Sequence, residues 1–182
     1  NDMQVLVSPE RRQAIDTGAL LTGLPISTRD VVADIGCGPG FLTLPLARYL
    51  TEGRVHALDI QQEMLDAAQE RLNSARLTNV EATLSKDDTV PLDDESVDGV
   101  FAAFVVHEAE NSTALLAESF RCLRPGGWIA LLEWYKREME EGPPMEDRID
   151  KPELRGLAQK VGFRYTTGRD LTSGQYMLLM RK

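Results

Sequence analysis

The residues that decide the fold of this chain are Val31-Val32-Ala33-Asp34-Ile35-Gly36-Cys37-Gly38-Pro39-Gly40-Phe41. Val31–Ile35 is a short, mostly apolar run closed by glycine, which predicts a buried strand. Three alternating glycines follow, so the backbone can turn tightly and a ligand can approach main-chain N–H groups without meeting a Cβ atom. Phe41 stands where a dinucleotide-binding fingerprint has its third glycine, so the pattern is GxGxG and not GxGxxG. Taken alone, the glycines also fit a strand-to-helix turn that binds nothing.

A second polar signal lies at the end of the next predicted strand, Arg54–Ile60. Asp59 follows Gly36 by 23 residues. In doubly wound folds an acid at this position accepts hydrogen bonds from ribose hydroxyls, because the second strand runs beside the first and ends at the same edge. Combined with the glycine loop, this spacing makes Asp59 a specific candidate for binding a ribose.

Strands and helices alternate along the chain, which predicts a parallel sheet with helices on both faces. The last two strands follow each other too closely for a helical crossover, so we expect that pair to be antiparallel. Expected strands cover residues 31–35, 54–60, 80–84, 97–106, 128–134, 163–169 and 175–181. The first expected helix begins at Ser8-Pro9 and ends by Gly23, and the second covers 41–50. A third presents Met64, Leu65, Ala68 and Leu72 on one face, and a fourth contains Leu116, Phe120 and Leu123. A fifth follows an Asp150–Glu153 capping box.

Length and composition are those of one globular domain. The 182 residues can bury a core without a disulfide or a metal. We expect residues 1–28 to form a helical lead within the same domain as residues 29–182, which carry the predicted binding site. The 20 basic against 29 acidic residues give a net charge of −9, which excludes a protein that relies on contacts to nucleic-acid phosphates.

Cellular location is predicted from what the sequence lacks. No run approaches 18 apolar residues, so no segment is expected to span a membrane, and the first residues do not resemble a signal peptide. Cys37 and Cys122 are 85 positions apart and form no CxxC pair. This pattern predicts a reducing, cytoplasmic setting and argues against a zinc site.

The motifs follow one another in an order that resembles the class I S-adenosylmethionine-dependent methyltransferases, nearest the ubiquinone/menaquinone-type and related small-molecule branch. They are Asp34–Gly40, Asp59, Val90–Asp98 and Leu123–Gly127, and the resemblance covers about residues 28–134. It implies an α/β fold: a Rossmann-like, seven-stranded doubly wound sheet of order 3-2-1-4-5-7-6 with strand 7 antiparallel, in three layers. It also implies S-adenosylmethionine as cofactor, S-adenosylhomocysteine as product and no metal.

The resemblance assigns cofactor contacts to particular residues. The methionine part would lie along Gly36, Cys37, Gly38 and Gly40. Asp34 would orient this loop or the cofactor's ammonium group, Asp59 would bind the ribose, and Ile60 and Met64 would lie near the adenine. The family often has an acid after strand 3, but Lys86 stands there and the acid is Asp87, one place later. The cofactor is net cationic, so an acidic pocket suits it better than the pyrophosphate of a dinucleotide.

Catalysis of methyl transfer rests mainly on proximity and desolvation, because the sulfonium is already electrophilic. A base is needed only for an acceptor that arrives protonated. The candidates at the ends of the fourth and fifth strands are His107, Glu108, Glu133, Trp134 and Tyr135, with His107 and Glu108 as the candidate catalytic pair. His107 directly follows an apolar run and titrates near neutral pH. Alternatively, His107 binds a loop carbonyl and Glu108 caps a helix or contacts the cofactor.

The acceptor is predicted to be a small molecule. His107-Glu108-Ala109 replaces the Asn-Pro-Pro-Tyr type motif of DNA amino-methyltransferases, and no insertion is large enough for a substrate domain. The acceptor must be held by the first 28 residues, by strand-end loops or by a second subunit of a homo-oligomer. Lys136–Asp150 is either a solvated loop or a lid. Other readings remain: a different enzyme on this fold, such as an aminopropyltransferase or dehydrogenase, or a non-catalytic subunit that binds the cofactor.

Overall fold

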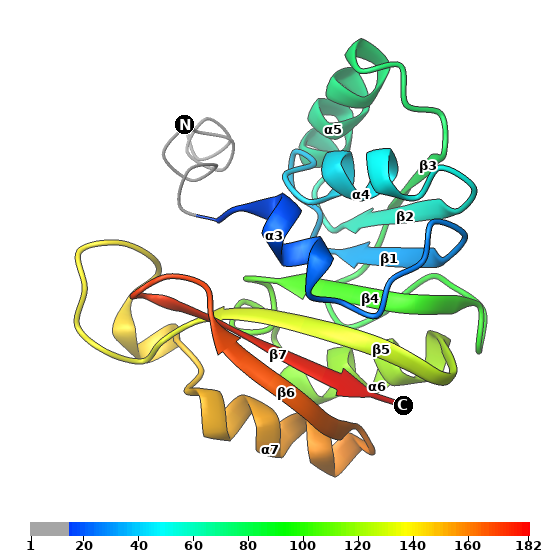
Figure 1. Ribbon diagram of the computed structural model, residues 1–182. Coiled ribbons are helices and arrows are strands. Elements are labelled where there is room, and N and C mark those ends of the chain that lie inside the picture. Colours follow the sequence, from blue (N-terminus) through cyan, green and yellow to red (C-terminus); the bar gives the residue numbers. More distant parts are fainter. Residues whose placement is uncertain (1–14) are drawn as a thin grey trace.

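The computed structural model describes residues 15–182 and shows one twisted sheet with helices on both faces (Figure 1). The strand order is β3-β2-β1-β4-β5-β7-β6, in which β7 is antiparallel to both of its neighbours and the other pairs are parallel. This confirms the predicted fold, including the antiparallel final pair. The strands are β1 (Val31–Ile35), β2 (Arg54–Asp59), β3 (Val80–Leu84), β4 (Val97–Ala103), β5 (Leu123–Trp134), β6 (Arg164–Asp170) and β7 (Gln175–Arg181).

The helices fill the connections between strands. They are α3 (Thr17–Thr22), α4 (Thr43–Tyr49), α5 (Gln62–Ser74), α6 (Ser112–Cys122) and α7 (Lys151–Val161), with a 3-10 turn, η1 (Met145–Asp147), before α7. The predicted start of the first helix at Ser8-Pro9 lies outside the described residues. Within them, α3 is capped by the Asp16 carboxylate, which accepts a hydrogen bond from the Ala19 N–H, and it ends at Gly23 as predicted.

Two predicted strand boundaries are wrong by several residues, whereas β2 ends one residue earlier than predicted and β6 is shifted by one residue. β4 ends at Ala103 rather than Val106, because Phe104 adopts a left-handed φ of 59° and turns the chain out of the strand. β5 begins at Leu123 rather than Trp128, because Leu123 pairs with Val97 before the ladder shifts register at the next pair, Gly99 and Trp128. His107 therefore belongs to a loop and does not follow a strand directly.

Smaller differences concern helix ends. α4 begins at Thr43 rather than Phe41, and α6 ends at Cys122, so Leu123 is not helical. Asp150 is the N-cap of α7, but its side chain makes no capping hydrogen bond, so the predicted capping box does not form. Pro152 in the first turn fixes a helical φ there without it.

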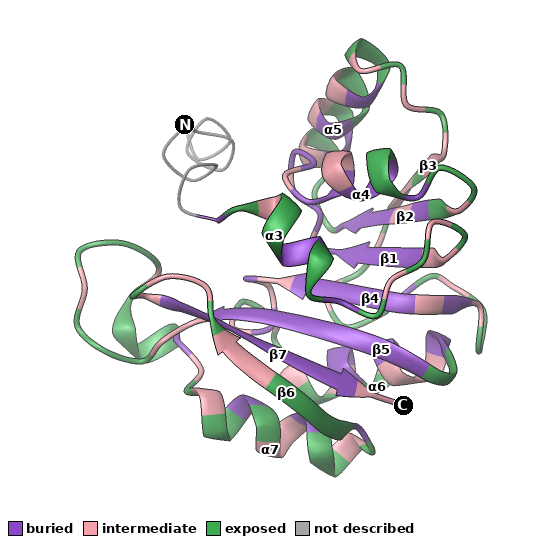
Figure 2. Ribbon diagram, in the orientation of Figure 1, coloured by how far each residue is buried: buried purple, intermediate pink, exposed green. Residues whose placement is uncertain are grey.

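Each face of the sheet carries its own apolar core (Figure 2). One core joins the sheet to α6 and α7, and the other joins it to α3 and α4. Ile15, Leu20, Leu21 and Leu24 belong to the second core, together with Val32 of β1. This supports the proposal that the residues before position 29 are part of the same domain, at least from Ile15 onward. Across residues 15–182 there is no helix with the length and apolar character needed to cross a membrane.

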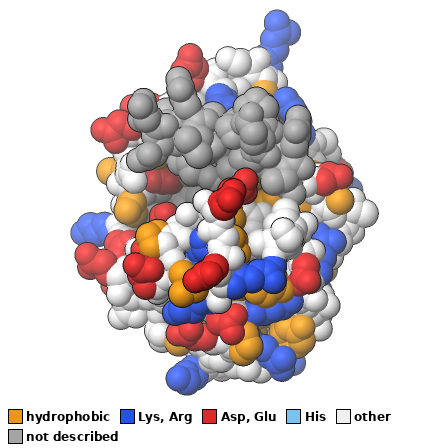
Figure 3. Space-filling view, turned by 90° about the vertical axis from the view of Figure 1, so that its left-hand side faces the viewer, with side chains coloured by type: hydrophobic (Ala, Val, Ile, Leu, Met, Phe, Trp, Pro, Cys, Tyr) orange, Lys and Arg blue, Asp and Glu red, His pale blue; other side chains and the backbone are white. Residues whose placement is uncertain are grey.

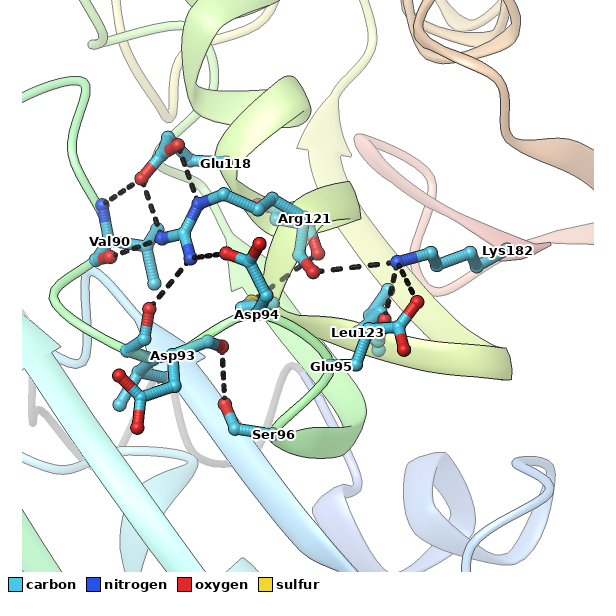
Figure 4. A network of polar contacts seen from close by, with 12 residues as sticks. Val90, Asp93, Asp94, Glu95, Ser96, Glu118, Arg121, Leu123 and Lys182 are labelled. Carbon is cyan, nitrogen blue, oxygen red and sulfur yellow. Dashed lines mark hydrogen bonds and ion pairs between the residues drawn. The ribbon is translucent and has the colours of Figure 1, made fainter.

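Arg121 near the end of α6 holds the loop that precedes β4 (Figure 4). Its guanidinium donates to the Glu118 and Asp94 carboxylates and to the main-chain carbonyls of Leu92 and Val90. The hydrogen bond from Arg121 is the largest influence on the Glu118 carboxyl and lowers its pKa below 4.5. One side chain thereby links α6 to the connection between β3 and β4.

Arg121→Ala should lower the free energy of unfolding by about 1–2 kcal/mol at pH 7, since the charged hydrogen bonds are partly exposed. Because the Glu118 pKa is lowered by folding, the stabilisation from this carboxylate is complete above its unfolded pKa near 4.5 and is lost as the pH falls through the lower folded value. Urea unfolding at pH 7 and near pH 3 should show a smaller difference between wild type and Arg121→Ala at the acidic pH. A difference that does not depend on pH would contradict this role of Glu118.

Candidate active site

The glycine loop leaves β1 at the edge where β2 and β4 also end. Gly36, Gly38 and Gly40 have φ values of 67°, 51° and 85°, the left-handed region that favours glycine. A Cβ atom on Gly36 would lie 2.7 Å from Val105 Cγ2, and one on Gly40 would lie 2.8 Å from Leu44 Cδ1. Among residues 15–182, no atom would lie within 4 Å of a Cβ atom on Gly38. Gly36 and Gly40 therefore have close neighbours besides their left-handed φ, whereas no described residue packs against Gly38.

Gly38→Val should weaken binding of S-adenosylhomocysteine by about tenfold or more, because the side chain would fill the open space beside the loop. The left-handed φ adds a stability cost of about 1–2 kcal/mol, too small to unfold a typical domain. Calorimetry and thermal melting measure the two effects separately. The matched control is Gly156→Ala in α7, where a Cβ atom also meets nothing within 4 Å. Normal affinity in Gly38→Val would mean that Gly38 does not face the ligand.

Asp59 at the end of β2 connects the glycine loop to α5. Its Oδ2 accepts the Gly38 N–H at 2.8 Å, and its Oδ1 accepts the Gln61 N–H at 2.9 Å. The side chain that the sequence assigns to the ribose thus also fixes the loop that borders the open space. The sequence did not reveal this contact between residues 21 positions apart.

Asp34 lies below the loop and is almost completely buried. It accepts a hydrogen bond of 2.6 Å from Thr43 Oγ1, at the first residue of α4. Burial raises the pKa of Asp34 to about 7; the Thr43 bond opposes this shift and the charge of Asp59 adds to it. Two carboxyl groups under one loop favour a cationic ligand over a phosphate. Thr43 was not among the predicted site residues, although a hydroxyl at a helix start after the glycines was a usable signal.

Cys37 is held inside the loop. Its N–H donates to the Leu58 carbonyl at 2.9 Å, and burial raises the pKa of its thiol far above neutrality. A thiol that stays protonated is a poor nucleophile. Cys37 therefore contributes shape and not covalent chemistry.

The remaining predicted cofactor residues lie on the same edge. Ile60 follows β2 with 52% of its surface exposed, and Met64 is half-buried in the first turn of α5. Asp87, in the turn after β3, accepts the Glu110 N–H at 2.8 Å and so connects this turn to the loop after β4. Their contacts with a cofactor stay predictions.

His107 and Glu133 meet where β4 and β5 end. His107 Nδ1 lies 2.8 Å from Glu133 Oε2, and the His107 N–H donates to Glu133 Oε1 at 3.2 Å. Glu108, the other predicted catalytic residue, has its Oε1 3.8 Å from His107 Nε2, beyond hydrogen-bonding distance. The structure therefore brings His107 together with Glu133 more closely than with Glu108, and the predicted alternative of a loop carbonyl is not the partner of Nδ1.

Trp134 and Tyr135 follow Glu133 on opposite faces of the sheet. Trp134 packs on Phe104 with 5.4 Å between ring centroids, whereas Tyr135 lies 4.9 Å from Tyr176 and donates its hydroxyl to Asp170. They do not form a single aromatic wall. An open hollow of about 590 Å³ adjoins Trp134, lined by residues 137–141 and 172–175. The side of the molecule at which β1, β2 and β4 end faces the viewer in Figure 3, and acidic and basic side chains are interspersed over the part that is not drawn in grey.

Residues 136–150 are held by Arg148, a side chain that is almost fully buried. Its guanidinium donates to the carbonyls of Pro143, Arg137 and Glu141 at 2.7–2.8 Å. Because one side chain binds several main-chain carbonyls, this loop has a defined shape although η1 is its one regular element. Among residues 15–182 no group of His, Cys, Asp and Glu side chains could hold a metal ion.

A family model described as "Methyltransferase domain" matches residues 33–131, more than half of the chain. With this match and the fold, the chain belongs to the class I S-adenosylmethionine-dependent methyltransferases and is an enzyme of that class. The matched segment contains the glycine loop, Asp59, Asp87 and His107.

Individual relatives show how far the likeness extends. A crystal structure of a SAM-dependent methyltransferase from Aquifex aeolicus has a TM-score of 0.94 and 29% identity, covering 99% of this chain and 96% of that one. The ubiquinone/menaquinone biosynthesis C-methyltransferase UbiE of Marinomonas sp. is 27% identical, covering 79% of this chain and 70% of that protein. The malonyl-[acyl-carrier protein] O-methyltransferase of the same strain is 32% identical, covering 67% of this chain and 44% of that protein. The chain spans less than two thirds of most of the curated relatives reported with it.

Proposed function

We propose that this methyltransferase binds S-adenosylmethionine along the glycine loop and transfers its methyl group to a small-molecule acceptor. The cofactor site is supported by the hydrogen bond from the Gly38 N–H to Asp59, and by the space beside Gly38, where no atom of residues 15–182 would lie within 4 Å of a Cβ atom. In this proposal Asp59 accepts the ribose hydroxyls, and the acidic pair of Asp34 and Asp59 favours the cationic methionine part. Cys37 and Gly40 shape the loop, and Ile60, Met64 and Asp87 border the adenine.

The bound cofactor would supply a methyl group on a sulfonium, and the chain's own residues would supply position. The loop after β4 lies against the glycine loop, because Val105 is the residue that a Cβ atom on Gly36 would strike. An acceptor held between this loop and the end of β5 would meet the methyl carbon from the side of His107. Catalysis would then come mainly from alignment and from exclusion of water.

A small-molecule acceptor is supported by charge and by architecture. The net charge of −9 disfavours nucleic acid as a partner. One relative is named as a C-methyltransferase of ubiquinone/menaquinone biosynthesis and another as a malonyl-[acyl-carrier protein] O-methyltransferase, so the relatives do not agree on one acceptor. Two buried, unpaired cysteines agree with a reducing, cytoplasmic setting. Light scattering would test whether a homo-oligomer completes the acceptor site.

The cofactor proposal is tested by calorimetry with S-adenosylhomocysteine and with NAD. We expect binding of S-adenosylhomocysteine and binding of NAD that is at least a hundredfold weaker, because Phe41 replaces the third dinucleotide glycine. The acceptor proposal is tested by incubating the protein with methyl-labelled cofactor and a fractionated cell extract. Label in the protein or nucleic-acid fraction, and none in the small-molecule fraction, would refute it.

Residues 136–150 should exchange their amide hydrogens more slowly when cofactor product and acceptor are bound together. The loop leaves β5 at the binding edge, and Arg148 already fixes its shape, so that it could move as a unit. Hydrogen exchange with and without saturating ligands measures this, with α7 as the internal reference. Unchanged hydrogen exchange would mean that the segment is a solvated loop and not a lid.

A further inference from the structure

Glu133 is a fully buried carboxylate that contacts the His107 ring and accepts hydrogen bonds from the main-chain N–H groups of His107 and Trp134. His107 lies in the loop between β4 and α6, residues 104–111, which is called the histidine loop below. We propose that Glu133 positions His107 as a general base, which takes a proton from the molecule that receives the methyl group. We also propose that this molecule attacks through a neutral hydroxyl and not through a carboxylate. The inference rests on the proposed function, because it concerns the reaction at the same site.

The geometry fixes which nitrogen of His107 is available. An ionised carboxylate can only accept hydrogen bonds, so the contact of 2.8 Å to Glu133 Oε2 requires the proton of a neutral imidazole to lie on Nδ1. Nε2 then carries the free lone pair. Glu133 Oε1 also accepts the His107 main-chain N–H at 3.2 Å, so the ring and its backbone are both oriented by one side chain.

The histidine loop lies beside the cofactor loop. Val105, two residues before His107, is the contact of Gly36, and Glu110, three residues after it, donates its N–H to Asp87. The loop is therefore attached on both sides of His107 to residues of the proposed cofactor site. The His107 side chain is only 4% exposed, so in this proposal the acceptor would have to lie directly against its ring.

The three charged side chains that act most on the imidazole are all acidic. Glu133 belongs to β5, Glu108 to the histidine loop itself, and Asp147 to the 3-10 turn before α7. Tyr176 of β7 pairs with Glu133 and donates its hydroxyl to the Ile149 carbonyl. Burial alone lowers the pKa of His107, but the hydrogen bond to Glu133 and the acidic charges outweigh burial and raise it above 6.5.

These surroundings select the acceptor. They stabilise an imidazolium and repel an anion, so a carboxylate acceptor would be disfavoured, and it would need no base because it is already ionised. A neutral amine attacks through its lone pair before it loses a proton. A hydroxyl becomes a strong nucleophile only as its proton leaves, which is the task that a positioned base performs.

The step balances without any further reactant. The hydroxyl oxygen forms a bond to the methyl carbon while the carbon–sulfur bond breaks. The electron pair of the broken bond stays on sulfur, which becomes a thioether. The hydroxyl proton moves to Nε2 of His107. The products are a methyl ether, S-adenosylhomocysteine and an imidazolium paired with the Glu133 carboxylate.

The pairing is tested by NMR on the ¹⁵N-labelled protein, without any acceptor. The chain has two histidines, so His56→Gln leaves His107 as the only imidazole signal. We expect a neutral ring protonated on Nδ1, and a pKa that falls by about one unit or more in Glu133→Gln. The matched control is Glu81→Gln. Because Glu81 Oε2 lies 3.6 Å from His56 Nδ1, this substitution should leave the pKa of His107 unchanged. A neutral ring protonated on Nε2, or an unchanged pKa in Glu133→Gln, would overturn the pairing.

The role in catalysis is tested with [¹³C-methyl]-labelled cofactor and a deproteinised small-molecule cell extract. We expect a methyl ether by its ¹³C chemical shift; a methyl ester, N-methyl or C-methyl product would overturn the acceptor class. His107→Asn keeps a donor to Glu133 and should lower kcat by about 10²–10⁴-fold. Glu133→Gln should lower kcat by about tenfold and move the acidic limb of kcat/KM to lower pH. An unmoved limb would leave Glu133 a structural role only. Unchanged binding of S-adenosylhomocysteine in both variants separates this result from a failure of the cofactor site.

Discussion

Asp59→Ala should weaken binding of S-adenosylhomocysteine by about a hundredfold. Each hydrogen bond from a ribose hydroxyl to a charged acceptor contributes ~1.5–3 kcal/mol, so loss of one or two such bonds reaches this factor. The variant also releases the Gly38 and Gln61 N–H groups, which loosens the loop that borders the ligand. Asp59→Asn should be less severe, about tenfold or more, because the amide keeps the size and one acceptor oxygen.

The structure changes how this experiment is interpreted. Since Asp59 accepts the Gln61 N–H at the start of α5, both variants should also melt at a lower temperature without ligand, by a loss of about 1 kcal/mol. The ligand-induced rise in melting temperature is therefore the discriminating quantity. Asp30→Ala is the control, because its carboxylate accepts the Ser27 N–H next to the start of β1, at the edge opposite the site. An undiminished ligand-induced rise in Asp59→Ala would leave Asp59 only a capping role.

Gly99→Ala should lower the free energy of unfolding by about 3 kcal/mol or more. A Cβ atom on Gly99 would lie 2.2 Å from Trp128 Cζ2, a separation that no packed pair can hold. Trp128 cannot easily yield, because it is buried and its ring packs edge-on against Phe101 with 5.4 Å between centroids. Overpacking at such a site displaces backbone or rotamers. Urea unfolding at neutral pH measures the effect.

A double variant identifies the cause. Trp128→Phe removes the part of the indole that the new methyl group would strike, at the cost of a cavity of its own. If the contact is responsible, Gly99→Ala combined with Trp128→Phe should be more stable than the sum of the two single effects predicts. Additive effects, or a Gly99→Ala protein as stable as wild type, would contradict the packing argument. Because β4 leads into the histidine loop, activity should fall with the stability.

The sequence placed most of the fold correctly because the determining signals are local. Residues 31–35 are a mostly apolar run and residues 80–84 alternate apolar and polar side chains, and both strands have the predicted bounds. The errors fall where a tertiary contact overrides a local pattern. Val105 and Val106 continue the apolar run of β4, yet the chain leaves the sheet at Phe104, whose N–H then bonds to the Leu132 carbonyl. Leu123 resembles the end of a helix but pairs with Val97 instead.

The features of the candidate site also fall into two groups, those that a local pattern predicts and those that a tertiary contact decides. The sequence predicted the edge of the sheet at which the glycine loop and Asp59 lie, because alternating glycines and an acid at a fixed spacing are local patterns. The class of enzyme was indicated by the resemblance of its motifs to a family, and the family match confirms that class. Only the tertiary structure decided that Asp59 binds the Gly38 N–H, that Thr43 binds Asp34, and that Glu133 rather than Glu108 is the partner of His107. Such partners come from neighbouring strands, and the distance between strand ends is set by the order and register of the sheet, which no local pattern records.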